Sequence, residues 1–434
     1  MKSKNRVFMQ LIAVLDIIVF LTAAKMLPFI SSYDVIIGVM LVIFLLMLYV
    51  AGFYSFRHSR SFKFASTFIA LLAVFDAANV IVQYVFLYEL VYGRKVLILF
   101  DIILFIYFTY RWVIINRRVI NSKMPVYMLC SGQSSGIADK IKSEKVLVGM
   151  GLVYKGICEY DGVFRDEDKN ELTLGDCIII IDSLENYNRD IQKAMFQTKI
   201  NGGALMSYED FCEVFLEKIP VENITDEWLI LSRGFENIFS NFYIRAKRLF
   251  DIFVSLFGLI LASPILLVSA VMIKLDSRGP VIFSQTRSSM LGSVFTIHKL
   301  RTMTCDAEKD GAQWAVKNDC RITKVGNFLR KTRIDEIPQL YNVLKGDMSF
   351  IGPRPERPEF DKDLQKEIPY YMLRYLVKPG LTGWAQVNHG YGASIEDSKI
   401  KLMYDLYYIK NYSFLLDFRI ILRTLHIVLF GKGR

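Results

Sequence analysis

Metal-site and disulfide patterns are missing from this sequence. Its six cysteines form no C-x-x-C pair and no regular spacing, and only four histidines are present. Structural zinc sites need closely spaced Cys and His ligands, so a zinc module is excluded. Free thiols in a reducing compartment are expected. Proline and glycine are also scarce, at 11 and 26 of 434 residues, which excludes a collagen-like or disordered chain.

Apolar residues are abundant and concentrated in the first part of the chain. Hydrophobic residues make up 53% of the sequence, and the mean hydropathy is +0.31. Four apolar stretches, residues 7–30, 35–56, 64–88 and 96–115, approach or exceed the ~20 residues that cross a hydrocarbon core. No small-residue cleavage site follows the first stretch, so it is not a removed signal peptide. We predict a four-helix transmembrane domain over residues 1–120.

Charge divides the chain and orients the predicted bundle. The net charge is +7 over residues 1–120, −8 over 121–240 and +11 over 241–434. The acidic middle argues against a nucleic-acid groove along the whole length. Basic residues precede the first stretch, join the second to the third and follow the fourth, which predicts a cytoplasmic N-terminus. We expect the acids inside the stretches to pair within the bundle, namely Asp16, Asp76 and Asp101.

Residues 121–236 have the pattern of a soluble α/β domain. A predicted strand over 126–130 leads into Gly132-Gln-Ser-Ser-Gly136 and a helix, and 177–181 has the composition of a buried parallel strand. Only two glycines of the dinucleotide-binding pattern are present, and no ribose-binding acid is clear. The sequence therefore predicts a Rossmann-like domain with a structural or regulatory role.

A fifth apolar stretch, residues 249–273, contains Ser263-Pro264 at its middle. Proline removes a helical hydrogen bond and clashes with the preceding turn. Basic residues flank the stretch on both sides, so neither end is favoured for export. We expect a re-entrant helix that enters the membrane, breaks at Ser263-Pro264 and returns to the same face. The alternative is a kinked fifth span that places the C-terminal domain outside.

The C-terminal region, residues 237–434, contains two adjacent acids, Asp335 and Glu336. Pro338 is compatible with the first turn of a helix, and Gly346 with its end, so we predict a helix from near Asp335 to near Lys345. Carboxylates at a helix N-terminus are favoured in their ionised form. Adjacent carboxylates also suit Mg²⁺, which commonly bridges substrate phosphates. The alternative is an ordinary acidic first turn.

Basic residues surround this pair in the sequence. Lys299 and Arg301 alternate with apolar residues, so a strand would direct both to one face. Arg330 lies just before the acids, and Arg354 lies between two prolines that favour an extended backbone. Such guanidinium groups suit bidentate phosphate binding. Because no Walker A loop or kinase motif is present, we favour phosphate transfer through an attacking carboxylate.

Residues from about 245 to 424 resemble the bacterial sugar transferase family, the polyprenyl-phosphate hexose-1-phosphate transferases. The resemblance rests on ordered motifs: Lys247-Arg-Leu-Phe-Asp251, Ser263-Pro264, Gln285-Thr-Arg287, His298-Lys-Leu-Arg-Thr-Met303, Asp335-Glu-Ile-Pro-Gln339, the run from Gly346 to Pro355, Lys378-Pro-Gly-Leu-Thr-Gly-Trp-Ala-Gln386 and Asp405-Leu-Tyr-Tyr408. The four stretches and the middle domain resemble the long members of that family, which start exopolysaccharide, capsule or O-antigen synthesis at the bacterial inner membrane.

The resemblance implies transfer of a sugar 1-phosphate from a UDP-sugar to undecaprenyl phosphate, with release of UMP. Asp335 would be the nucleophile, and Glu336 would help to hold Mg²⁺ or orient the acceptor phosphate. Ser263-Pro264 would break the re-entrant helix. The substrate-binding residues would be Lys299, Arg301, Arg330, Gln339, Asn342 and Arg354, and the supporting acids would be Asp405 and Asp417.

One departure concerns Ser288-Ser289, which follow Arg287 where the family has a residue and then glycine. A glycine needed for an unusual φ would be replaced at some cost, so we expect strain in the loop 288–292. An inactive transferase-like scaffold or regulator of polysaccharide assembly is the alternative function, and a lipid-phosphate hydrolase is another. The hexose transferred and homodimerisation stay open, and no nucleic-acid partner is expected.

Overall fold

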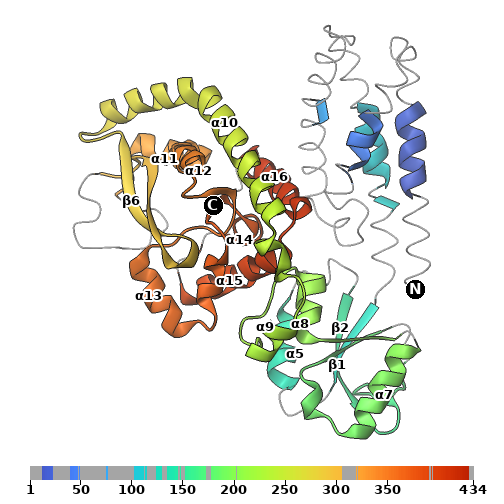
Figure 1. The fold of residues 1–434 in the computed structure, drawn as a ribbon. Coiled ribbons are helices and arrows are strands. Elements are labelled where there is room, and N and C mark those ends of the chain that lie inside the picture. Colours follow the sequence, from blue (N-terminus) through green and yellow to red (C-terminus); the bar gives the residue numbers. More distant parts are fainter. Residues whose placement is uncertain are drawn as a thin grey trace. The chain divides into compact units, whose positions relative to one another are not determined.

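The computed structural model divides the chain into two compact units, Met1–Leu216 and Glu217–Arg434, each described below by itself. Figure 1 shows the ribbon of the chain. The predicted domain limits 1–120, 121–236 and 237–434 stay predictions. The structure describes residues 12–22, 40–46, 48, 75–76, 102–111, 113–114, 124–129, 134–144, 147, 152–172, 177–201, 203–304, 319, 321–390, 392 and 394–429.

Described residues from all four N-terminal apolar stretches pack together. The ring of Phe44 lies 5.2 Å from those of Phe20 and Phe75 and 5.8 Å from that of Phe108, between centroids. The described helices Ile12–Thr22 and Ile102–Arg111 are apolar but shorter than a span, so the four-helix transmembrane domain stays a prediction.

The buried acid of the first stretch is paired, as predicted. Asp16 accepts a hydrogen bond of 2.8 Å from the hydroxyl of Tyr107 and lies 3.5 Å from the Arg111 guanidinium. Asp101 lies outside the described residues.

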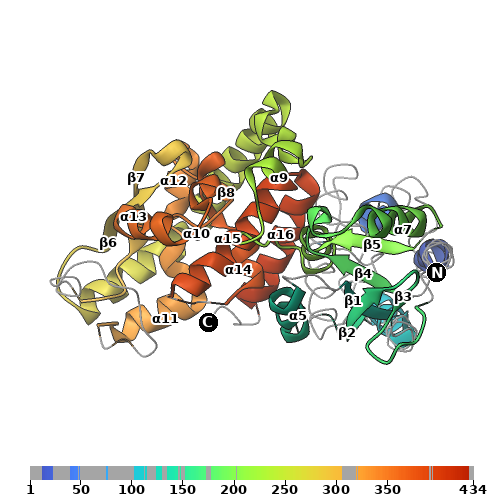
Figure 2. The same cartoon turned by 90° about the horizontal axis from the view of Figure 1, so that it is seen from below.

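The middle of the chain forms a five-stranded sheet in the order β3-β2-β1-β4-β5 (Figures 1 and 2). β1 pairs in parallel with β2 and β4, β4 pairs in parallel with β5, and only β2–β3 is antiparallel. The predicted strands over 126–130 and 177–181 are β1 and β4. The elements are β1 Met124–Leu129, α5 Ser134–Ser143, β2 Leu152–Tyr160, β3 Phe164–Arg165, β4 Ile178–Ile181, a 3₁₀ turn Leu184–Asn186, α7 Arg189–Ile200, β5 Ala204–Ser207, α8 Tyr208–Phe211 and a π-helical turn Cys212–Leu216.

Both faces of this sheet are covered, because successive residues of a strand point to opposite sides. Val126 and Met128 of β1 pack with Ile141 of α5 and with α8, whereas Tyr127 and Leu129 pack on the other face with α7. Parallel strands buried on both faces read as apolar runs, and the four isoleucines of β4 are buried. This layering agrees with the predicted Rossmann-like domain.

The second unit has a mixed α/β fold built around two short strand pairs. β6 and β7 form an antiparallel hairpin, and β8 and β9 pair in parallel. A large apolar cluster joins α15 to the segment that follows α13 and to Trp384 of α14. The elements are α9 Asp226–Leu231, α10 Asn241–Asp276, β6 Ile282–Ser288, β7 Val294–Leu300, α11 Lys324–Thr332, α12 Gln339–Lys345, β8 Ser349–Ile351, α13 Pro358–Glu367, β9 Gly380–Thr382, α14 Trp384–Asn388, α15 Ile395–Lys410 and α16 Phe414–Leu429, with 3₁₀ turns at Phe235–Phe239, Met290–Gly292, Ile334–Glu336 and Tyr371–Leu376.

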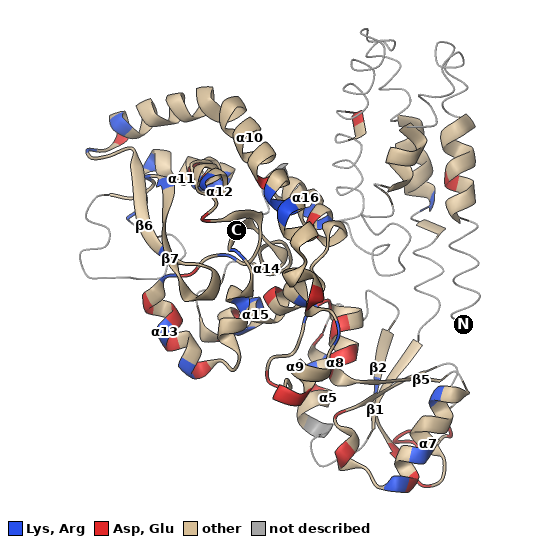
Figure 3. Cartoon of the chain, in the orientation of Figure 1, with Lys and Arg blue, Asp and Glu red and all other residues tan. Residues whose placement is uncertain are grey.

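Helix α10 is long and apolar enough to cross a membrane, the one such helix in the described part of the chain. It runs without interruption through Pro264, so the predicted break at Ser263-Pro264 is instead a continuous helix. The ribbon of α10 changes direction along its length (Figure 1), as expected when proline removes one hydrogen bond but the neighbouring turns persist. Figure 3 shows charged residues near both ends of α10 and none between them.

The two ends of α10 pack against the same unit. Near one end, Arg248 donates hydrogen bonds of 2.6 Å to the carbonyls of Val343 and Leu344 in α12. At the other end, Asp276 accepts a 3.1 Å hydrogen bond from the backbone of Val325 in α11. Between these anchors, no residue over 256–268 is buried.

Candidate functional site

Asp335 and Glu336 lie in the 3₁₀ turn Ile334–Glu336, between α11 and α12. Arg333 enters the left-handed region at φ 59° and ends α11. The predicted helix from Asp335 is wrong at its start, since α12 begins only at Gln339. Pro338 has no N–H, and the turn bonds through the tighter pattern Glu336 N to Arg333 O, 3.2 Å.

Glu336 is buried and surrounded by cations. Its carboxylate accepts a 2.7 Å hydrogen bond from Arg354 and lies 3.6 Å from Lys299 Nζ and 3.7 Å from Arg333. Burial opposes its ionisation, but the charges of Arg354, Lys299 and Arg333 outweigh burial and hold the pKa of Glu336 below its usual range. Glu336 is therefore a fixed counter-ion.

Asp335 has a different environment although it is the neighbouring residue. Its side chain is buried, and among the described residues its Oδ1 has no hydrogen-bond partner. Burial, together with the adjacent charge of Glu336, raises the pKa of Asp335 to about 6. Neighbouring acids with separated pKa values take different chemical roles. Asp335 is the member of the pair with an oxygen available for chemistry.

Lys299 reaches this pair from β7, one residue before that strand ends at Leu300. Burial and the nearby charge of Arg354 lower the pKa of Lys299 to about 8, although Glu336 opposes the shift. Because this pKa is still above 7, Lys299 is mostly protonated and positively charged at pH 7. The structure thus brings predicted residues Lys299, Glu336 and Arg354 together.

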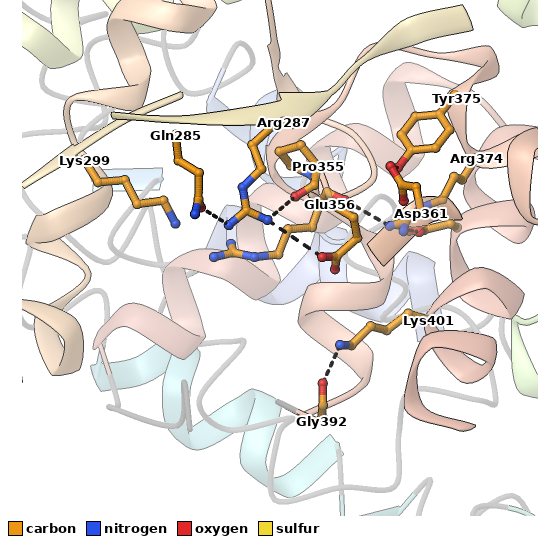
Figure 4. Close-up of polar contacts among 12 residues, drawn as sticks. Gln285, Arg287, Lys299, Pro355, Glu356, Asp361, Arg374, Tyr375, Gly392 and Lys401 are labelled. Carbon is orange, nitrogen blue, oxygen red and sulfur yellow. Dashed lines mark hydrogen bonds and ion pairs between the residues drawn. The ribbon is translucent and has the colours of Figure 1, made fainter. Parts of the chain in front are cut away.

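The hairpin is tied to the loop that carries Arg354. Arg287 of β6 donates hydrogen bonds to Gln285 Oε1, at 2.8 Å, and to the carbonyl of Pro355, at 3.2 Å (Figure 4). Its guanidinium also lies 3.7 Å from Glu356. These contacts place the hairpin side chains beside the Arg354 loop.

The backbone of Gly352-Pro-Arg-Pro355 is fixed by close packing on β9. Gly352 N donates to Thr382 O at 2.9 Å, and Gly380 N donates to Pro353 O at 2.8 Å. A Cβ at Gly352 would lie 2.4 Å from the carbonyl oxygen of Lys378, so only glycine fits. The loop therefore holds Arg354 in place over Glu336.

Two further predicted residues border the pair. Arg330 of α11 donates a 2.8 Å hydrogen bond from Nε to Thr302 Oγ1, and its charge acts against the upward pKa shift of Asp335. Gln339 is buried at the start of α12, and its Nε2 has no hydrogen-bond partner among the described residues. Both positions are compatible with a bound anion.

Two other predicted binding residues contact backbone groups instead. Arg301 lies just beyond β7 and donates to the carbonyls of Ser277 and Arg278, at 2.7 and 2.8 Å. The amide of Asn342 bonds the backbone of the hairpin, since it accepts from His298 N and donates to Thr296 O. Both side chains join neighbouring elements.

The supporting acids are buried in networks that join helices. Asp405 of α15 pairs with Arg374 at 3.0 Å, and burial raises the pKa of Asp405 to about 6. Asp417 of α16 accepts from Lys247, at 2.6 Å, and from the hydroxyls of Tyr243 and Tyr408. The sequence reasoning missed Arg374, whose signal is a lone arginine within the apolar turn Tyr371–Leu376.

The strain expected in the loop 288–292 lies at Leu291 and not at Ser289. Ser289 has φ −127°, which any residue adopts. The left-handed residues of this loop are Leu291, at φ 56°, and Gly292, at φ 78°. The replacement of glycine at Ser289 therefore carries no backbone penalty.

The acidic pair is the candidate metal site. Among the described residues, no group of three or more Cys, His, Asp or Glu side chains could hold a metal ion. Mg²⁺ commonly takes one or two carboxylates together with substrate phosphates, and Asp335 Oδ1 is a buried carboxylate oxygen with no hydrogen-bond partner in the part of the chain that the structure describes. The donor set therefore fits magnesium that binds together with a phosphate ligand.

Known proteins resemble the C-terminal part of this chain in sequence. The family model described as "Bacterial sugar transferase" matches residues 242–431. A "UDP-N-acetylgalactosamine-undecaprenyl-phosphate N-acetylgalactosaminephosphotransferase" of Aeromonas hydrophila is 49% identical over 194 residues, which cover 45% of this chain and 46% of that protein. A "UDP-glucose:undecaprenyl-phosphate glucose-1-phosphate transferase" of Klebsiella pneumoniae is 48% identical over 180 residues, 41% of this chain and 39% of that protein.

A shorter relative is matched over most of its length. The "Uncharacterized sugar transferase EpsL" of Bacillus subtilis (strain 168) is 41% identical over 191 residues, which cover 43% of this chain and 89% of that protein. By contrast, the matched region spans less than half of the Aeromonas and Klebsiella proteins.

Proposed function

This chain belongs to the bacterial sugar transferase family, and we propose that it transfers a sugar 1-phosphate from a UDP-sugar to undecaprenyl phosphate, with release of UMP. The names of the relatives support both substrates, because they specify undecaprenyl phosphate as acceptor and UDP-linked glucose or N-acetylgalactosamine as donor. The product would be the first lipid-linked sugar of an exopolysaccharide, capsule or O-antigen.

The observation that carries the proposal is the buried Oδ1 of Asp335, which has no hydrogen-bond partner within the described ranges, beside Glu336, whose charge is neutralised by Arg354. Asp335 attacks the phosphorus attached to the sugar, the bond from that phosphorus to the bridging oxygen breaks, and UMP leaves with the electron pair. An oxygen of the acceptor phosphate then attacks the same phosphorus and releases the Asp335 carboxylate. Each half-reaction forms one bond to phosphorus and breaks another, so one difficult transfer is divided into two easier steps.

Cationic side chains stabilise the charge that spreads over the phosphoryl oxygens. Lys299 and Arg354 lie against Glu336, and their positive charges would neutralise the donor phosphates. Mg²⁺ held by Asp335 and Glu336 would supply further positive charge to the diphosphate when it is bound. Glu336 keeps Arg354 and Lys299 in position whether or not the donor is present.

The catalytic unit would sit at the inner leaflet on a re-entrant α10. Both ends of α10 pack on the same unit, through Arg248 and Asp276. The unburied part, 256–268, is about 20 Å long at 1.5 Å per residue, which is less than the ~30 Å hydrocarbon core. These dimensions favour a helix that enters and leaves on one side. We place the N-terminus and the catalytic unit in the cytoplasm of a multi-pass inner-membrane protein.

The test is intact-protein mass spectrometry after incubation with each UDP-sugar and Mg²⁺ but no acceptor. We expect UMP release and a mass increase of one sugar phosphate in the native protein, and neither in Asp335→Asn. Addition of undecaprenyl phosphate should remove the adduct and yield the lipid-linked product. Free sugar phosphate would indicate a hydrolase, and no UMP with any donor would indicate a scaffold. An adduct in Asp335→Asn would remove Asp335 from the nucleophile role.

A further inference from the structure

We propose that Arg374 is a positioning residue for phosphate transfer, which holds the backbone of Arg354 and so fixes where the Arg354 guanidinium meets Glu336. The hydrogen bonds of Arg374 described below go to neither Asp335 nor Glu336. Arg374 therefore acts on the site through Arg354. This inference rests on the proposed function of the site and adds a residue that the motifs around Asp335 did not indicate.

The guanidinium of Arg374 has three hydrogen-bonding partners. Nη2 donates to the carbonyl oxygen of Arg354 at 2.9 Å and to Asp405 Oδ2 at 3.0 Å, and Nη1 donates to the hydroxyl of Tyr371 at 2.6 Å. The side chain is 4% exposed. Figure 4 shows Arg374 beside Asp361 and Tyr375, on the side of the Pro355–Glu356 segment away from Lys299.

A second layer of side chains holds these partners in place. Asp361 of α13 accepts hydrogen bonds from Tyr371, at 3.0 Å, and from Tyr375, at 2.7 Å. The Arg374 guanidinium also lies 5.2 Å from the centroid of the Tyr371 ring and 5.6 Å from that of Tyr375. Three elements, α13, the 3₁₀ turn Tyr371–Leu376 and α15, therefore determine the position of one guanidinium.

The Arg354 loop can be held only in a limited number of ways. Its two prolines have no N–H, so the carbonyl oxygens must take much of the restraint. Pro353 O accepts from Gly380 N at 2.8 Å, Arg354 O from Arg374 at 2.9 Å and Pro355 O from Arg287 at 3.2 Å. Three consecutive carbonyls are thus bound by donors from three different segments. Arg374 is the donor to the residue whose side chain reaches Glu336.

A planar fork of donors is needed for this arrangement. Arginine presents several N–H groups in fixed directions, whereas lysine is a single ammonium on a flexible stem. In Arg374→Lys, the charge opposite Asp405 is kept, but one ammonium cannot reproduce the bonds to Arg354 O, Asp405 and Tyr371 together. We expect Arg354 to lose its fixed position, and a misplacement near 1 Å in such a site costs about 10²-fold in rate.

The experiment compares kcat and KM for UMP release in full-length Arg374→Lys, Arg354→Lys and the double variant. We expect kcat of Arg374→Lys to fall about 10²-fold with little change in the unfolding temperature. Because Arg374 acts through Arg354, kcat of the double variant should be no lower than kcat of the less active single variant. Arg419→Lys is the control, since Arg419 is also an arginine paired with an acid, Glu217 at 2.9 Å, but it lies in α16, which carries none of the three donors named above for the Arg354 loop.

The outcomes separate this inference from the proposed function. If the native protein releases no UMP from any UDP-sugar, the proposed function fails. If the native protein turns over but Arg374→Lys keeps its kcat, or the losses multiply in the double variant, the positioning role is refuted. An equal fall of kcat in Arg419→Lys would also refute it, because loss of any paired guanidinium would then suffice. If Arg374→Lys does not fold, Asp405→Asn, which frees Arg374 from its acid, provides the same comparison with Arg354→Lys.

Discussion

The charge of Lys299 should control the pH dependence of the first half-reaction. In the native protein, Asp335 must be ionised to attack, and its pKa is raised to about 6 by burial and by Glu336. Lys299 must be protonated to neutralise phosphate, and its pKa is lowered to about 8 by burial and by Arg354. The rate should therefore fall below about pH 6 and again above about pH 8.

Lys299→Gln removes a cation that favours ionised Asp335. Lys299 is one of the charges that lower the pKa of Asp335. A nearby charge shifts a carboxyl pKa by about 1 unit or more, so without Lys299 the pKa of Asp335 should rise toward 7. At pH 6 the ionised fraction would then fall from about one half to about one tenth, roughly fivefold relative to the rate at the plateau. The fall above pH 8 should disappear, because the group that causes it is absent.

The assay is the burst of UMP without acceptor, because the acceptor phosphate itself titrates near pH 6. Rates are measured from pH 5 to 9 at one Mg²⁺ concentration, so the effect of the metal on Asp335 is shared by both proteins. Lys345→Gln is the control, because Lys345 is 60% exposed and pairs with Asp347 outside the site. If the fall in rate at acidic pH stays in place or moves to lower pH in Lys299→Gln, the proposed effect of Lys299 on Asp335 is refuted.

Three other changes have defined outcomes. Removal of Mg²⁺ with EDTA should lower UMP release at least about tenfold, and Mg²⁺ should restore it, whereas full activity in EDTA would exclude the metal. Gly326→Val should lower the free energy of unfolding by about 2–4 kcal/mol, because a Cβ there lies 2.1 Å from Thr302 O. Gly136→Ala is its control in the same thermal unfolding experiment: a Cβ there meets no described atom within 4 Å and alanine favours the helix α5, so stability should not fall. Single cysteines at Asn241 and Ser277, in a chain without native cysteines, should both react with an impermeant maleimide only in opened cells, and reaction of one in intact cells would indicate a spanning α10.

Local sequence patterns were sufficient for part of the fold and site. The apolar runs predicted β1 and β4, and alternation predicted β7 with Lys299. Asp335 and Glu336 are adjacent, so the sequence already placed them together. Arg354, 18 residues from Glu336, was found because its flanking prolines mark a rigid loop.

The remaining site geometry depends on contacts that no local pattern contains. Arg374 bonds Arg354 and Asp405, 20 and 31 residues away. Arg301 continues the alternating pattern of β7, yet its guanidinium donates hydrogen bonds to carbonyls at the end of α10. Periodicity predicts which face a side chain occupies. Periodicity does not predict which buried carbonyl lacks a backbone donor. An arginine that donates to such a carbonyl has a structural role, and this can be recognised only from the three-dimensional structure.

Helix α10 and the acidic pair belong to one packed structure, because polar residues near the start of α10 bind the elements that flank Asp335, Glu336 and Arg354. Arg248 holds the carbonyls that end α12, the helix that follows the acidic pair. Asp251 accepts from Ser349 Oγ and from Phe350 N in β8, which leads into the Arg354 loop. The polar residues at this end of an otherwise apolar helix therefore have partners in the elements that flank the acidic pair and Arg354.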